Sequence, residues 1–119
     1  FGNIGSGFAA ILEENKEQIE CSLSRSIVIK RILVKDPENF TDLNITEEYF
    51  TGNADLILND PEIDIVVELI GGVHPAYEYI TRAIESGKHV VTANKAIMAI
   101  YGRELLKEVL VVEYQLLHP

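Results

Sequence analysis

Residues 65–92 read IVVELIGGVHPAYEYITRAIESGKHVVT, and this stretch decides the fold class. The nearly continuous apolar run at 65–69, closed by a pair of glycines, predicts a buried β-strand. Pro75 suits the first turn of a following helix, and Gly87 suits the position just after its end. Val90-Val91-Thr92 predicts the next strand. A strand, a helix and a strand in this order predict a βαβ unit with parallel strands.

The same alternation extends to both sides of this unit. We predict further helices and strands as follows: a helix over 3–20, a strand over 27–34, short helices over 46–50 and 53–59, a helix over 94–108 that is open to a break at Gly102, and a strand over 109–113. Alternating strands and helices predict an α/β fold, a Rossmann-like doubly wound parallel sheet with right-handed crossovers.

Composition limits the possible partners. The chain has 119 residues, of which 47% are apolar and 24% charged, so we expect one soluble globular domain. The net charge of −9 argues against nucleic acid and anionic membranes as partners. We find no apolar run of the ~18 residues that a membrane span needs, and no signal peptide. Cys21 is the single cysteine and indicates a reducing compartment, so we expect a cytoplasmic protein.

The first residues are unusual because a glycine-rich turn normally follows a strand. Phe1-Gly2-Asn3-Ile4-Gly5 opens the chain without a methionine. We therefore expect a sheet truncated at its first strand, with residues 1–119 forming a partial domain. Loss of that central strand would leave strand edges open to pairing with another chain.

Gly2 and Gly5 match the second half of the G-x-G-x-x-G dinucleotide fingerprint. Gly2 would let the backbone approach a pyrophosphate, and Gly5 would let the helix pack closely on a strand. The free N–H groups at the helix start would hold the phosphate. The alternative is a glycine-rich helix start used only for packing, and the motif alone does not separate the two.

The end of the second predicted strand carries Lys35 and Asp36. Asp36 would accept from a ribose 2′-hydroxyl and favour NAD, whereas Lys35 would pair with a 2′-phosphate and favour NADP. Lys35 lies 30 residues after Gly5, a spacing longer than usual that the long first helix explains. The alternative is a solvated turn.

Two further strand ends meet the same edge of the predicted sheet, where ligands of open α/β sheets bind. One carries Gly71 and Gly72, and the other carries Thr92, Asn94 and Lys95. Lys95 would reach a cofactor ribose or a substrate oxygen, the alternative being an exposed lysine in a first helical turn. The cysteine and histidines show neither a nucleophile's partner nor metal-ligand spacing, so we predict no metal site.

Four stretches stand in the order seen in homoserine dehydrogenases: FGNIGSG at 1–7, LVKD at 33–36, DIVVELIGG at 64–72 and GKHVVTANKA at 87–96. Over roughly residues 1–108 the chain resembles the amino-terminal nucleotide-binding domain of that family. The resemblance implies NAD(P)-dependent interconversion of L-homoserine and L-aspartate 4-semialdehyde, a step toward threonine and methionine.

The resemblance also implies roles for individual residues. Lys35 matches the basic residue on the adenosine 2′-phosphate side, and Lys95 matches a lysine near the reacting centre, which we take as the catalytic candidate. Gly71, Thr92 and Asn94 would lie near the nicotinamide half. The residues that would touch the pyrophosphate and adjoining ribose are Phe1, Gly2, Asn3, Ile4 and Gly5.

The stretch at 110–119 departs from the family pattern. The family's substrate-binding and dimer-forming region would lie beyond residue 119, so we expect these 119 residues alone to be inactive and the full-length protein to be a homodimer.

Two other hypotheses about the function remain open. One is the cofactor domain of a glucose–fructose type oxidoreductase, although that group has E-K-P where Ala93-Asn94-Lys95 stands here. The other is a non-catalytic module that senses a nucleotide.

Overall fold

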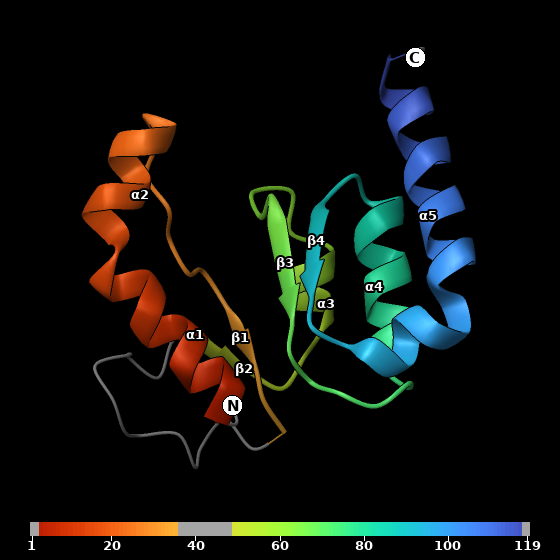
Figure 1. The fold of residues 1–119 in the computed structure, drawn as a ribbon, viewed down its shortest axis with the longest axis horizontal. Helices are drawn as coiled ribbons and strands as arrows, with labels where there is room; N and C mark the ends of the chain where they lie inside the picture. The colour runs from red at the N-terminus through yellow and green to blue at the C-terminus, as the bar shows by residue number, and fades with distance from the viewer. Residues whose placement is uncertain (1–2, 36–48, 118–119) are drawn as a thin grey trace. The chain divides into compact units, whose positions relative to one another are not determined.

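The computed structural model describes residues 3–35 and 49–117, and their side chains over 7–35 and 49–112. The chain forms two compact units, Phe1–Asn53 and Ala54–Pro119. Each unit contains one two-stranded parallel sheet together with its helices (Figure 1). The fold is therefore mixed α/β with small parallel sheets, as the alternating pattern predicts.

The first unit begins with two consecutive helices, α1 (Asn3–Glu14) and α2 (Lys16–Leu23). The helix predicted over 3–20 is confirmed, but it is interrupted at Asn15, where the backbone leaves helical geometry. The Asn15 side chain donates a hydrogen bond to the carbonyl oxygen of Ile11 at 2.8 Å. Side chains of this kind compete with the helical hydrogen bonds, which explains the interruption.

The strand predicted over 27–34 is much shorter in the structure. Only β1 (Ile32–Leu33) is paired, in parallel with β2 (Phe50–Thr51). Among the described residues, 27–31 are not assigned to a strand, so their β-branched pattern alone does not predict how far the ladder extends. The short helix predicted through Phe50 is wrong at that residue, which is buried in β2. Its proposed capping residue, Thr46, lies outside the described residues.

The second unit confirms the βαβ prediction. It contains α3 (Asp55–Leu58), β3 (Ile65–Glu68), α4 (Ala76–Glu85), β4 (His89–Thr92) and α5 (Lys95–Leu117). Strands β3 and β4 are parallel, and Ile65 pairs with His89. Gly87 has a φ of +79°, as expected for the residue that ends α4. Figure 1 shows α4 beside the two strands and α5 beside α4.

Side-chain contacts connect α3 and the loop before β3 to α4 and to the turn between α4 and β4. Arg82 forms an ion pair with Asp55, with 2.7 Å between the charged atoms. The Lys88 ammonium donates to the carbonyl oxygens of Asp60 and Ile63 at 2.5 and 2.7 Å. These contacts fix where β3 starts, and thereby where its carboxyl end lies.

The core of the second unit lies between α4 and α5. Its buried cluster consists of Ala76, Ile80, Ile84, Ile97 and Leu105. Ile97 is fully buried, and its burial contributes about 1.5–3 kcal/mol relative to an exposed position. The cluster fixes α5 against α4, and so fixes the first turn of α5 beside the strand ends.

The strand predicted over 109–113 is wrong, because α5 continues without a break through Gly102 to Leu117. Val109 and Val112 pack against the core cluster together with Tyr101. Leu110 and Val111 between them are exposed. This is the spacing of a helix face and not of a strand, so packing on α4 overrides the β-preference of the valines.

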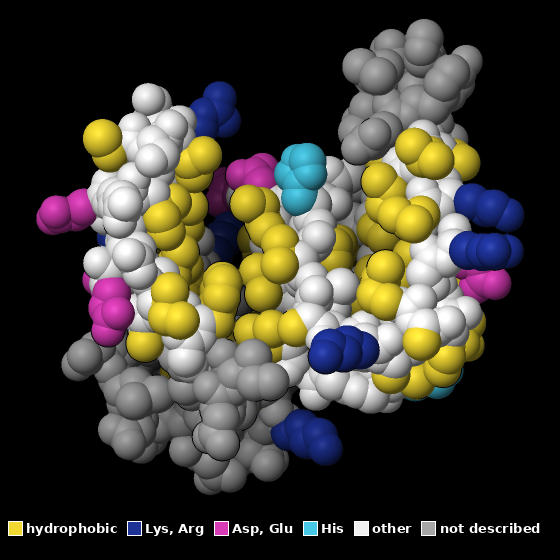
Figure 2. Space-filling view, viewed as in Figure 1, with side chains coloured by type: hydrophobic (Ala, Val, Ile, Leu, Met, Phe, Trp, Pro, Cys, Tyr) yellow, Lys and Arg dark blue, Asp and Glu magenta, His cyan; other side chains and the backbone are white. Residues whose placement is uncertain are grey.

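The face of the β3–β4 sheet away from this core is apolar and open. Ile65 and Val91 are 53% and 55% exposed. Hydrophobic side chains are visible over these strands in Figure 2. No helix in the described part of the chain combines the length and apolar character that crossing a membrane requires.

Candidate functional site at the carboxyl ends of β3 and β4

The two strand ends of the second unit lie side by side. Glu68 and Thr92 are the last residues of β3 and β4, and they are partners in the parallel register. The turns that follow them, at 69–75 and 93–94, therefore leave the same edge of the sheet. This is the edge at which open α/β sheets bind ligands.

A buried carboxylate joins the two turns. Glu68 is only 4% exposed. Its Oε2 accepts hydrogen bonds from the backbone N–H groups of Ile70 and Gly71, at 3.0 and 3.2 Å. Its Oε1 accepts a hydrogen bond from the Thr92 hydroxyl at 2.5 Å. The carboxylate is thus bound by three donors, which offset the cost of burying it.

Asn94 makes a second connection between the turns. Its side-chain amide donates to the carbonyl oxygen of Gly72 at 2.6 Å, and its Oδ1 accepts from the backbone N–H of Ile97 at 3.1 Å. The latter bond caps the amino end of α5. The Thr92 hydroxyl also accepts from the Asn94 backbone N–H at 3.0 Å. The positions of both turns and of the helix start are therefore coupled.

The turn after β3 is left open on its outer side. Gly71 and Gly72 have φ angles of +81° and +70°, which side chains with a Cβ rarely adopt. A Cβ added at either glycine would meet no heavy atom within 4 Å. The backbone of this turn is therefore accessible from its outer side.

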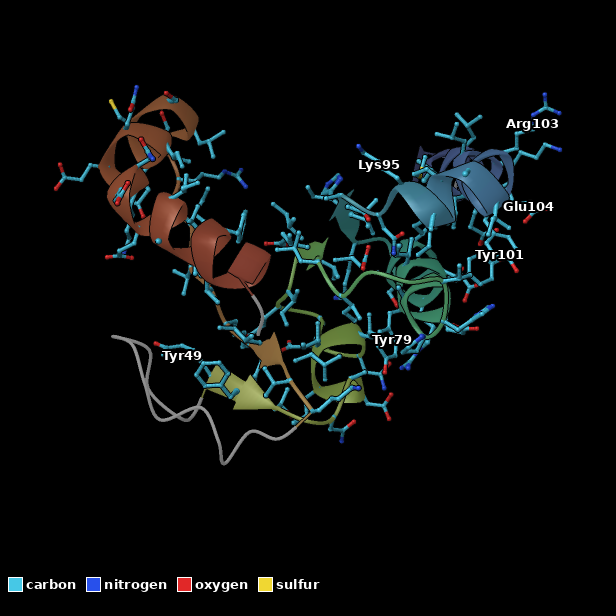
Figure 3. The ribbon with its side chains drawn as sticks, turned by 60° about the horizontal axis from the view of Figure 1, so that its bottom comes forward. Tyr49, Tyr79, Lys95, Tyr101, Arg103 and Glu104 are labelled. Carbon is cyan, nitrogen blue, oxygen red and sulfur yellow. The ribbon has the colours of Figure 1, made fainter. Side chains whose placement is uncertain are left out.

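Lys95 begins α5 beside this turn. Its side chain is exposed and points away from the helix into solvent (Figure 3). Within the described part of the chain the ammonium has no ion-pair partner. The amino end of a helix carries partial positive charge, so a lysine there is unfavourable by about 0.3–1 kcal/mol. A bound anionic or polar ligand would compensate for that cost.

The predicted site residues fall into both units. Gly71, Thr92, Asn94 and Lys95 are brought together at one sheet edge, as expected. In the first unit, Lys35 is exposed just after β1, while Asn3, Ile4 and Gly5 form the first turn of α1. Phe1 and Gly2 lie outside the described residues, as does Asp36.

The structure adds detail to two of these predictions. The side chains of Thr92 and Asn94 are occupied by hydrogen bonds within the turns. Any ligand contact by these residues would therefore involve mainly their backbone atoms. The second unit also has a hollow of about 220 Å³, but it lies at the opposite end of β4, between His89 and Val112, and contains none of these residues.

Sequence reasoning did not single out Glu68 as a functional residue. Its signal was an acidic residue that ends an apolar strand immediately before a glycine pair. An isolated carboxylate is costly at such a buried position, so its presence there indicates a dedicated set of hydrogen-bond donors.

Comparison with known proteins decides the family. The family model described as homoserine dehydrogenase, NAD binding domain, matches residues 1–119. The chain belongs to the homoserine dehydrogenase family. The cofactor expectation is confirmed with it, since the matching region is an NAD-binding domain. The hypothesis of a glucose–fructose type enzyme is thereby superseded.

Individual homoserine dehydrogenases show the same similarity. The chain is 39% identical to the *Bacillus subtilis* enzyme over 107 residues, and 43% identical to the *Lactococcus lactis* enzyme over 108 residues. These alignments cover 90% and 88% of this chain but only 25% of each relative. The chain therefore spans about a quarter of the length of these curated relatives.

Solved structures agree in fold. The crystal structure of the homoserine dehydrogenase from S. aureus matches with a TM-score of 0.88 and 39% identity, covering 95% of this chain and 29% of that one. The enzyme from *Thiobacillus denitrificans* matches with a TM-score of 0.85 and 39% identity, covering 95% and 26%.

Proposed function

We propose that this chain is the cofactor-binding part of an enzyme that interconverts L-homoserine and L-aspartate 4-semialdehyde with NAD or NADP. The observation that carries the proposal is the sheet edge where the open glycine turn after β3 meets the capped, lysine-bearing start of α5. The nicotinamide cofactor supplies hydride transfer. The chain supplies a surface that holds and orients this cofactor.

At this edge the residues have distinct proposed roles. The open backbone at Gly71 lies against the nicotinamide half, and Thr92 and Asn94 hold the adjoining turn in place. Lys95 is the proposed catalytic residue, because its free ammonium can donate a hydrogen bond to a substrate oxygen or a cofactor ribose. Family membership supports these assignments, since Lys95 matches a lysine near the reacting centre.

The adenosine half is assigned to the first unit. Lys35 stands exposed at the end of β1, where its charge can pair with a 2′-phosphate. We assign the pyrophosphate and adjoining ribose to the first five residues of the chain, Phe1, Gly2, Asn3, Ile4 and Gly5. The start of α1 supports that assignment, because the first N–H groups of a helix can bind a phosphate.

We further propose that residues 1–119 belong to one NAD(P)-binding Rossmann domain. In the strand order 3-2-1-4-5-6, removing strand 1 leaves the pairs 3-2 and 4-5. The observed pairing of β1 with β2 and of β3 with β4 agrees with this expectation. The single family match over 1–119 supports one domain.

The complete enzyme is proposed to act on homoserine and aspartate 4-semialdehyde as a cytoplasmic homodimer. Proton transfer at the substrate hydroxyl needs acid and base groups, which we place outside these 119 residues. We therefore expect the 119 residues alone to be inactive, although they contain the cofactor surface.

A direct test uses the complete protein that contains this chain. NADH and NADPH are titrated while nicotinamide fluorescence is followed, and homoserine oxidation is measured with NAD⁺ and NADP⁺. We expect saturable binding of at least one cofactor and homoserine-dependent formation of reduced nicotinamide. Absence of binding for both cofactors would contradict the proposed function.

A further inference from the structure

We propose that Glu68 is a positioning residue for the nicotinamide half of the cofactor site, a role that rests on the proposed function. Its carboxylate holds the Gly71–Gly72 turn and Thr92 in one fixed arrangement. Glu68 itself is 4% exposed and has both oxygens engaged, so it acts through these neighbours and not by touching the cofactor.

The fold alone does not require a carboxylate at this position. Alternation along β3 places Glu68 on the same face as Val66, whose register partner Val90 packs against the core cluster. An apolar side chain would extend that core, whereas a buried carboxylate has to recover its lost hydration from hydrogen bonds. Two of the three donors that Glu68 gathers belong to the turn after β3, and the third is Thr92 at the end of β4.

The direction of these hydrogen bonds explains why a carboxylate is suited to the position. An ionised carboxylate only accepts, so the Thr92 hydroxyl must direct its proton toward Glu68. The oxygen of that hydroxyl then remains free to accept from the Asn94 N–H. Asn94 in turn holds the carbonyl oxygen of Gly72. The connections thus close into a ring that runs from one turn to the other and back.

This ring also decides which backbone groups the site can offer. The N–H groups of Ile70 and Gly71 are directed inward to Glu68. They are therefore not available to hold an anionic part of the ligand. The outer side of Gly71 and Gly72 stays open, which suits the uncharged, nearly flat dihydropyridine ring of a reduced nicotinamide.

Glu68→Gln is the sharpest variant because it changes the shape of the side chain very little. With its amide oxygen toward Ile70 and Gly71, the glutamine would direct an N–H₂ group at the Thr92 hydroxyl. The Thr92 oxygen would then face two donors, and its own proton would lose its acceptor. In the opposite orientation, the N–H₂ group would face two backbone N–H groups. The first orientation leaves the Thr92 hydroxyl proton without its acceptor, and the second leaves the N–H groups of Ile70 and Gly71 without theirs.

The experiment uses the complete protein that contains this chain and compares two probes. NADPH reports the whole site, whereas adenosine 2′,5′-bisphosphate reports only the adenosine half. We expect Glu68→Gln to weaken NADPH binding about tenfold or more, the loss typical of a hydrogen bond to a charged group. We expect binding of adenosine 2′,5′-bisphosphate to stay unchanged. A general loss of folding would weaken both probes together, so the difference separates positioning from stability.

Two further variants complete the design. Glu104→Gln, at an exposed position on α5, is the matched control and should bind both probes as the wild type does. Thr92→Val removes the same hydrogen bond from the other side, and it keeps the proposal testable if Glu68→Gln fails to fold. In the double variant, the loss in NADPH affinity should be clearly smaller than the product of the two single losses.

The possible results separate a failure of the positioning role of Glu68 from a failure of the proposed function. Wild-type NADPH affinity in folded Glu68→Gln or in folded Thr92→Val would overturn the positioning role and leave the proposed function intact. Equal weakening of both probes would also overturn it. Failure of the wild type to bind either NADH or NADPH would instead overturn the proposed function, and the positioning role with it.

Discussion

The side-chain amide of Asn94 donates a hydrogen bond to the carbonyl oxygen of Gly72 over 2.6 Å, and so joins the turn after β4 to the turn after β3. The same side chain caps α5 through Ile97. One buried residue therefore determines both where the long helix begins and where the open glycine turn lies. The proposed nicotinamide surface depends on this double attachment.

Replacing Asn94 separates its two roles. Asn94→Ala removes the cap and the bond to Gly72, and we expect the free energy of unfolding to fall by about 2–4 kcal/mol. Asn94→Asp keeps an oxygen for the cap but cannot donate to Gly72, so its loss should be smaller. Urea unfolding followed by circular dichroism measures both variants. Equal losses would show that the cap does not contribute, whereas wild-type stability of Asn94→Asp would show that the bond to Gly72 does not contribute.

Replacing Lys35 tests the choice between the two cofactors. If its ammonium pairs with a 2′-phosphate, Lys35→Ala should weaken NADPH binding by about 1.5–3 kcal/mol and leave NADH binding nearly unchanged. Lys107→Ala, at an exposed position on α5, is the control. Fluorescence titration of the complete protein with each cofactor gives the two affinities. The same loss for NADH and NADPH would reject the proposed role of Lys35.

Replacing Lys95 should move stability and activity in opposite directions. Lys95→Gln removes a positive charge from the amino end of α5, and we expect the free energy of unfolding to rise by about 0.3–1 kcal/mol. Because the ammonium is proposed to stabilise a substrate oxygen, kcat of the complete enzyme should fall about 100-fold or more. Lys107→Gln is the control, lying further along the same helix. Unchanged kcat in Lys95→Gln would remove Lys95 from the catalytic machinery.

The last part of α5 can be tested as a helix or as a strand. Val112 packs against the core cluster and Val111 is 51% exposed. We expect Val112→Ala to cost about 1 kcal/mol of stability. Val111→Ala should be neutral or slightly stabilising, because alanine is the better helix former. Thermal unfolding of the two variants gives the comparison. A larger loss for Val111→Ala would argue for the strand that the sequence pattern suggested.

Sequence patterns predicted the second unit more accurately than the first. The strand at 65–69 and the helix that ends before Gly87 were predicted nearly at their true bounds, because their apolar spacing agrees with their glycine and proline positions. The strand at 27–34 was predicted too long. Its residues favour an extended chain, but the length of a ladder depends on the neighbouring strand as well as on local preference.

For the candidate site too, the sequence predicted some of the residues and missed another. Gly71, Thr92, Asn94 and Lys95 were identified from their positions at strand ends, which parallel topology brings to one edge. Glu68 was not identified, because its role depends on donors that lie both next to it and 24 residues away along the chain. Only the register of β3 with β4 brings Thr92 to the carboxylate.

By itself the sequence determined the alternation of strands and helices, the glycine turns and the family, because these depend on local spacing and on short ordered motifs. Tertiary structure alone decided that residues 109–112 continue a helix, since packing of Val109 and Val112 against the α4–α5 core outweighs the strand preference of valine. It also decided that Glu68, Thr92 and Asn94 form one hydrogen-bonded ring, because that ring needs two strands aligned side by side.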